Sequence, residues 1–135
     1  MQAAPTPPSS EEAIAALLTC RQENQRWTAA LSMNEADIDG LLGLLADLLE
    51  QPAYQSVHSR AVRYYGQLFR LKGRFRQIRS MYLCTSSTCG AICHEKLFGR
   101  HEALPLSFSL LNDEFNTVRA TCYQFLSGLV RLNLI

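Results

Sequence analysis

The residues best suited to chemistry form a cluster of cysteines and histidines in the second half of the chain. They are Cys84, Cys89, Cys93, His94 and His101. Thiolates and imidazoles are the ligands that zinc prefers, and four of them on one loop could close a tetrahedral site. One hypothesis is therefore a metal-binding protein that holds zinc with this segment.

The spacing within the cluster differs from that of most structural zinc sites. Those sites bring paired Cys-x2–4-Cys knuckles from two separate places, whereas these ligands form one local run with an adjacent Cys93 and His94. In the competing interpretation Cys84 ends a helix, Cys93 packs as a small apolar residue, and the histidines are solvated or bonded to backbone. We favour that interpretation and expect no cofactor.

The run of basic residues from 60 to 79 contains no acid and is the second candidate site. Arg63, Arg70 and Arg76 could grip phosphates or an acidic protein, helped by interleaved aromatic residues. Those aromatic residues are Tyr64, Tyr65, Phe69 and Phe75. The interpretation that we favour is internal, because basic residues beside an apolar seam can pair with the acids of the first helix. The basic residues in this role are Arg60, Lys72, Arg74 and Arg79, and the acids include Glu23, Glu35 and Asp37.

The motifs of common enzyme classes are absent from the sequence. It contains no glycine-rich phosphate loop, no His-Glu-x-x-His and no Gly-x-Ser-x-Gly. Its carboxylates do not recur in the Glu-x-x-His pairs of di-iron bundles. We therefore predict that the protein is not an enzyme.

Helices must position all of these residues, because apolar side chains recur at intervals of three and four along most of the chain. A first helix is predicted over residues 10–51, where Ser9 and Ser10 offer caps before Glu11 and Glu12. We favour one continuous helix, although Ser32 and Glu35 could form a capping box that restarts the chain. Two asparagines on its seam, Asn24 and Asn34, are partner-binding candidates, because buried amides at such positions fix register or oligomeric state. The alternative places them at a kink or an exposed edge.

Two further long helices are predicted over residues 56–84 and 104–132, with Pro105 in the first turn of the last one. A short helical segment is predicted near residues 91–98, and residues 1–9 are expected to be a disordered tail. Each helix must bury its stripe of apolar side chains, since burying one large apolar side chain stabilises the folded state by about 1.5 to 3 kcal/mol. The predicted fold is all-α: one domain over residues 10–135, built as an antiparallel three-helix bundle with coiled-coil-like heptad packing. The short segment would make a fourth helix.

The composition is that of an ordinary globular protein, with 47% hydrophobic and 19% charged residues and a formal charge of +1. This balance favours neither nucleic acid nor membrane as a partner. The richest apolar stretch, residues 41–49, is about half the length that crosses a bilayer. The start of the sequence lacks the features of a signal peptide, so we expect a cytoplasmic protein whose five cysteines are thiols.

Scattered residues along the chain resemble a known family. They are Glu23-Asn24-x-x-Trp27 with Leu31, Tyr64-Tyr65 through Phe69, His94 and His101 with Leu104, Phe115, Arg119 and Phe125-Leu126-Ser127. This pattern is similar to an uncharacterised family of small all-helical, coiled-coil-like proteins from Bacteroidetes bacteria. The resemblance implies a bacterial helical protein and carries no activity with it.

The first predicted helix is longer than the second, which leaves part of its apolar seam without an obvious neighbour. Either the segment between residues 84 and 104 covers this seam, or a second molecule does. We therefore predict a protein–protein interaction or scaffold module that binds another protein or a second copy of itself as a homodimer. Nucleic acid is not the expected partner.

Overall fold

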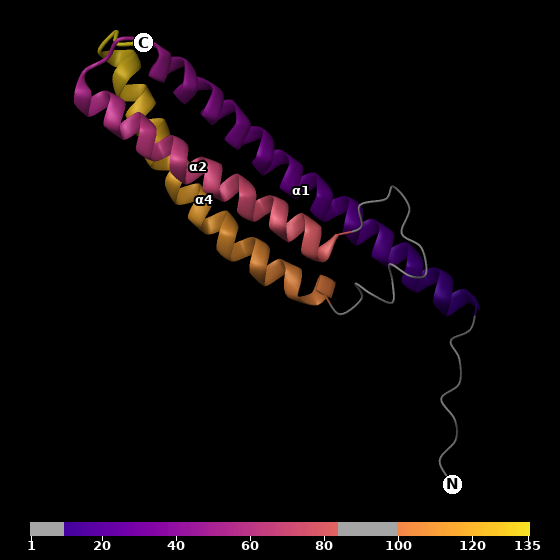
Figure 1. Cartoon of the computed structure of the whole chain (residues 1–135). Helices are drawn as coiled ribbons and strands as arrows, with labels where there is room; N and C mark the ends of the chain where they lie inside the picture. The colour runs from indigo at the N-terminus through magenta and orange to yellow at the C-terminus, as the bar shows by residue number, and fades with distance from the viewer. Residues whose placement is uncertain (1–9, 84–99) are drawn as a thin grey trace.

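The computed structural model of this chain describes residues 10–83 and 100–135, and it is all-helical there, with no strand. The helices are α1 (Ser10–Glu50), α2 (Gln55–Tyr82) and α4 (Arg100–Arg131). In Figure 1, α2 runs back beside α1, and α4 runs back beside α2. The prediction of an all-helical fold in which three long helices pack together is confirmed. The segment predicted near residues 91–98 and the tail of residues 1–9 lie outside the described residues.

Helix α1 is continuous over 41 residues and does not restart at Ser32. Instead of capping a new helix, Ser32 and Glu35 both accept hydrogen bonds from Arg79 of α2. The side chains that suggested a break therefore serve to join two helices.

Helix α4 begins at Arg100, four residues earlier than predicted, so Pro105 lies inside the helix and not in its first turn. The prediction that Pro105 lies in the first turn was wrong: the proline follows about one turn of helix, where its ring and its missing amide are less well tolerated than in the first turn. The packing of α4 favours the earlier start, since Leu104 is completely buried immediately before the proline.

The core lies along the apolar seams of the three helices. Its largest fully buried side chains are Phe75, Phe115, Leu31, Ile38, Leu45, Leu68 and Leu104. Phe75 of α2 meets two aromatic rings of α4, with centroid distances of 6.2 Å to Phe108 and 5.9 Å to Phe115. Trp27 of α1 packs edge-on against Phe108 at 5.1 Å. One aromatic cluster therefore ties α1, α2 and α4 together.

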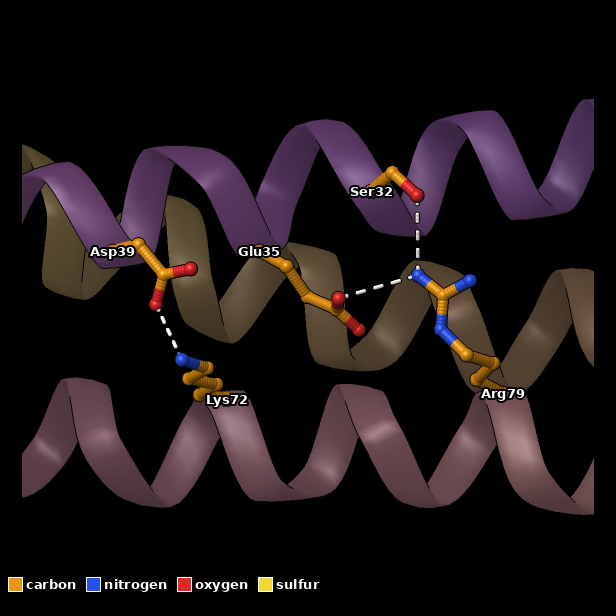
Figure 2. Close-up of polar contacts among 5 residues, drawn as sticks. All are labelled: Ser32, Glu35, Asp39, Lys72 and Arg79. Carbon is orange, nitrogen blue, oxygen red and sulfur yellow. Dashed lines mark hydrogen bonds and ion pairs between the residues drawn. The ribbon is translucent and has the colours of Figure 1, made fainter.

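Ion pairs beside the seams join the helices at their surface. Figure 2 shows the two that join α1 to α2: Lys72 pairs with Asp39, and Arg79 lies 3.2 Å from Glu35. The second oxygen of Glu35, Oε1, is buried and has no hydrogen-bond partner among the described residues. The acidic flank of α1 thus does meet the basic flank of α2, as the sequence suggested for Arg79 and Glu35.

Two other ion pairs involve α4, which the sequence did not indicate. Arg74 of α2 pairs with Glu114 of α4 and not with an acid of α1. Asp37 of α1 lies 3.2 Å from Arg119 of α4 and not beside a basic residue of α2. Helix α4 therefore pairs with charged residues of α1 and α2 that were expected to pair with each other.

None of the helices that the structure describes is both long enough and apolar enough to span a membrane.

Candidate partner-binding surface

Most of the predicted zinc cluster lies outside the described residues. Cys84, Cys89, Cys93 and His94 fall within residues 84–99, and His101 lies in the first turn of α4 with a side chain that is not described either. Within residues 10–83 and 100–135 as described, no group of three or more potential ligands is close enough to hold a metal ion. The zinc hypothesis therefore stays a prediction.

The two described cysteines, Cys20 and Cys122, are buried thiols. Cys122 is completely buried in α4, and this loss of solvent raises the pKa of its thiol from 9.0 to about 11. Thiolates are the nucleophilic and ligating form of cysteine, so such a thiol is inert at neutral pH. Cys122 is thus a core residue and not a candidate for redox chemistry.

The thiol of Cys122 should make the protein less stable in alkali. The unfolded chain loses this proton near pH 9, whereas the folded chain keeps it until about pH 11. Stability should therefore be independent of this group below pH 9 and should fall between pH 9 and 11, where only the unfolded state is ionised. Urea midpoints measured from pH 8 to 10.5 should fall more steeply for the parent than for Cys122→Ala, which removes the thiol. Equal slopes would contradict the prediction.

The side of α2 that points away from the core carries the predicted arginines. We call it the outer α2 face, and it consists of Val62, Arg63, Gly66, Phe69, Arg70, Gly73 and Arg76, all exposed. Most of these positions alternate by four and three residues, so they share one side of the helix. The arginines at 63, 70 and 76 form no hydrogen bond or ion pair with any described residue, in contrast to the pairs that hold Lys72, Arg74 and Arg79.

The apolar part of the outer α2 face is centred on Phe69, whose side chain is 63% exposed, with Val62 two turns earlier. The ring of Tyr65 lies nearly parallel to that of Phe69, with the two centroids 6.4 Å apart. Of the aromatic residues interleaved with the arginines, Tyr64 and Phe75 are buried and therefore cannot meet a partner.

Gly66 and Gly73 lie between the arginines of the outer α2 face. A Cβ atom added at either position would meet nothing within 4 Å. Glycine inside a helix is less stable than alanine by roughly 0.5 to 1 kcal/mol. The isolated fold therefore gains nothing from these two glycines, and they leave a bare strip of backbone on which another chain could approach closely.

The predicted asparagines lie elsewhere, on α1. Asn34 is partly buried, and its Nδ2 donates a hydrogen bond of 2.9 Å to Oδ1 of Asn112 in α4. Asn24, which lies earlier on the same helix, is also partly buried. The amide of Asn34 thus joins two helices of the same chain, and the sequence did not single out Asn112 as its partner.

Three kinds of comparison with known proteins return no match for this chain. No family model, no curated protein and no solved structure matches it. The resemblance to the Bacteroidetes family accordingly stays a prediction, and function has to be inferred from the chain's own residues.

The electrostatics of the outer α2 face restrict what can bind there. Its seven residues include three arginines and no acid, so two such faces would repel each other. An exposed phenylalanine and valine between arginines favour an apolar partner with flanking negative charge. The surface is therefore complementary in charge and polarity to an acidic amphipathic chain.

Proposed function

We propose that this chain is a protein–protein interaction module whose outer α2 face binds an acidic amphipathic helix of another protein. In this proposal the antiparallel bundle with heptad-packed seams is a rigid support, and α2 presents the binding surface. One observation carries the proposal: Arg63, Arg70 and Arg76 are exposed and form no ion pair among the described residues, while Lys72, Arg74 and Arg79 beside the seam are paired.

A separate protein fits this face better than a second copy of the chain. The acids of α1 nearest to α2, Glu35 and Asp39, are paired with Arg79 and Lys72, and Asp37 is paired with Arg119. A second copy would have to break internal ion pairs in order to offer these three acids, so it could dock without such a loss only through other acids, such as Asp47 and Glu50 near the end of α1. A homodimer remains the alternative, and it predicts a mass of two chains by light scattering.

An acidic helix also fits better than nucleic acid. Proteins that bind single-stranded nucleic acid stack its bases on aromatic rings. On the outer α2 face only Phe69 presents an aromatic ring, because Tyr64 and Phe75 are buried in the core. The apolar patch of Val62 and Phe69 instead suits side-by-side packing against the apolar stripe of a partner helix.

Selection from a displayed library of helical peptides tests the proposal. We expect the selected peptides to carry Asp or Glu on both sides of an apolar stripe. We also expect them to bind Arg63→Glu/Arg70→Glu/Arg76→Glu at least about tenfold more weakly, since three exposed charge pairs at about 0.2 to 1 kcal/mol each are lost and the reversed charges add repulsion. The matched control is Arg63→Lys/Arg70→Lys/Arg76→Lys, which keeps the charge and should retain most of the affinity.

Three results would contradict the proposal. The first is a library that yields no binder, and the second is a set of peptides without acidic enrichment that bind the parent and the charge-reversed variant equally. The third is tight binding of duplex DNA with a steep salt dependence that the same reversal abolishes, because it would favour the nucleic-acid alternative.

A further inference from the structure

A groove at one end of the bundle lies between the start of α2 and the end of α4. It is open to solvent and has a volume of about 400 Å³, within the range of small-molecule sites. Apolar side chains from both helices and from the end of the chain form its walls, among them Val57, Leu129, Leu132 and Leu134. The groove shares no residue with the outer α2 face, so binding of a ligand in it does not depend on the proposed function.

Arg60 places one positive charge in this groove. Its guanidinium carbon lies 4.7 Å from the centre of the Phe125 ring, and that ring is backed by Tyr64 at 5.3 Å. Arg60 forms no ion pair with any described residue, and the described residues that line the groove include no Asp or Glu. The charge is therefore held in position by an aromatic contact and is available to an anion.

A second hollow of about 390 Å³ extends the apolar surface at the same end of the molecule. It is lined by Pro52, Ala53 and Tyr54, and it shares Val57 and Leu134 with the first groove. The two hollows therefore lie side by side, with Arg60 in only one of them. A ligand that fits both has a charged group at one end and an extended apolar body.

The end of the chain gives this groove a defined wall. Asn133 adopts a left-handed conformation with φ of 54°, and the amide of Leu134 donates a 2.9 Å hydrogen bond to the carbonyl of Leu129. Together with the bond from the Asn133 amide to the Val130 carbonyl, this is a Schellman motif, which turns the chain back at a helix end. The motif directs Leu134 to the groove that it lines.

We infer that the groove binds a monocarboxylate with an unbranched apolar tail, of the size of a medium-chain fatty acid. A single guanidinium suits one carboxylate, which it can bind with two parallel hydrogen bonds. The open first turn of α2 adds positive potential on the same side, because it contains no acid and no side-chain cap. The tail follows the apolar walls from Leu129 and Leu132 toward Val57 and Leu134.

Binding of decanoate to the full chain, measured by calorimetry at concentrations below its micelle threshold, tests the inference. We expect saturable binding with one site per chain. Arg60→Gln should weaken it about tenfold or more, and Gly128→Leu should abolish it by filling the groove, since a Cβ atom at Gly128 meets nothing within 4 Å. Gly40→Leu is the matched control: the same substitution on α1, also into open space, should leave binding unchanged.

Two further ligands test separately how the charge and the tail contribute to binding. Decyltrimethylammonium has the same tail with the opposite charge, and butyrate has the same charge with a short tail, so both should bind at least about tenfold more weakly than decanoate. A peptide with a C-terminal leucine carboxylate tests the other source of this chemistry and should not compete. Absence of saturable decanoate binding, equal binding of the cationic amphiphile, displacement by the peptide, or unchanged binding by Gly128→Leu would each overturn the inference. Loss of binding in Gly40→Leu would also overturn it.

Discussion

Phe115→Asp is expected to abolish cooperative unfolding of this protein. Phe115 is completely buried, and its ring packs edge-on against Phe75 with centroids 5.9 Å apart. Removal of a buried phenylalanine side chain costs about 3 to 5 kcal/mol, and an unpaired carboxylate in its place costs several more. The total is comparable to the roughly 5 to 15 kcal/mol that typically stabilises a domain. Thermal unfolding followed by circular dichroism at 222 nm should show a broad, gradual loss of helix without a transition.

Phe69→Asp is the matched control for this experiment. It makes the same substitution at a phenylalanine that is 63% exposed on the outer α2 face. Surface substitutions of this kind usually change stability by less than about 0.5 kcal/mol, so its melting curve should stay close to that of the parent. A cooperative transition for Phe115→Asp near the parental temperature would show that Phe115 does not lie in the core.

The position of Phe115 could be predicted from the sequence alone, because the three-four alternation identifies the stripe that a helix must bury. The same pattern correctly marked Leu68 and Phe75, which are completely buried in α2. It was less useful at helix ends. Leu132 continues the stripe of α4 but is 69% exposed, because the helix ends at Arg131 and the chain turns back there.

The pairing of charges could be predicted from the sequence only in part. Helical periodicity shows on which flank of a seam a charge lies, but it does not show which neighbour covers that flank. Three helices can be arranged around a core with either handedness, and the choice decides whether α4 lies beside Arg74 or beside Lys72. The structure places Glu114 of α4 beside Arg74 and leaves Lys72 to Asp39 of α1.

The outer α2 face was predicted only in part. Its arginines were found through the charge run, but Val62, Gly66 and Gly73 were missed because the strong pattern of the buried seam hides a second stripe on the opposite side. The available signal was the four-three alternation of residues 62, 66, 69, 73 and 76 itself. The groove that contains Arg60 could not be predicted from the sequence, because it is assembled from the first turns of α2 and the last turns of α4, which are far apart in sequence.

Asn34→Leu and Asn112→Leu are each expected to destabilise the protein by about 1 to 2 kcal/mol. Each single variant leaves the other amide partly buried without the 2.9 Å hydrogen bond that now joins α1 to α4. An unsatisfied buried polar group costs about 1 to 3 kcal/mol, and partial burial favours the lower half of that range. Urea denaturation at constant m-value should report both changes.

The double variant Asn34→Leu/Asn112→Leu should recover most of this loss, because replacing both partners of a buried hydrogen bond by apolar groups can be nearly neutral. The recovery has a structural cost. A polar pair on an apolar seam allows one alignment of the helices, whereas two leucines also permit alignments shifted along the seam. The double variant should therefore keep its urea midpoint but show broadened amide resonances in α1 and α4 in a proton–nitrogen correlation spectrum. If the two single losses simply add, Asn34 and Asn112 do not interact; if the double variant keeps sharp resonances, the pair does not set the alignment of α1 against α4.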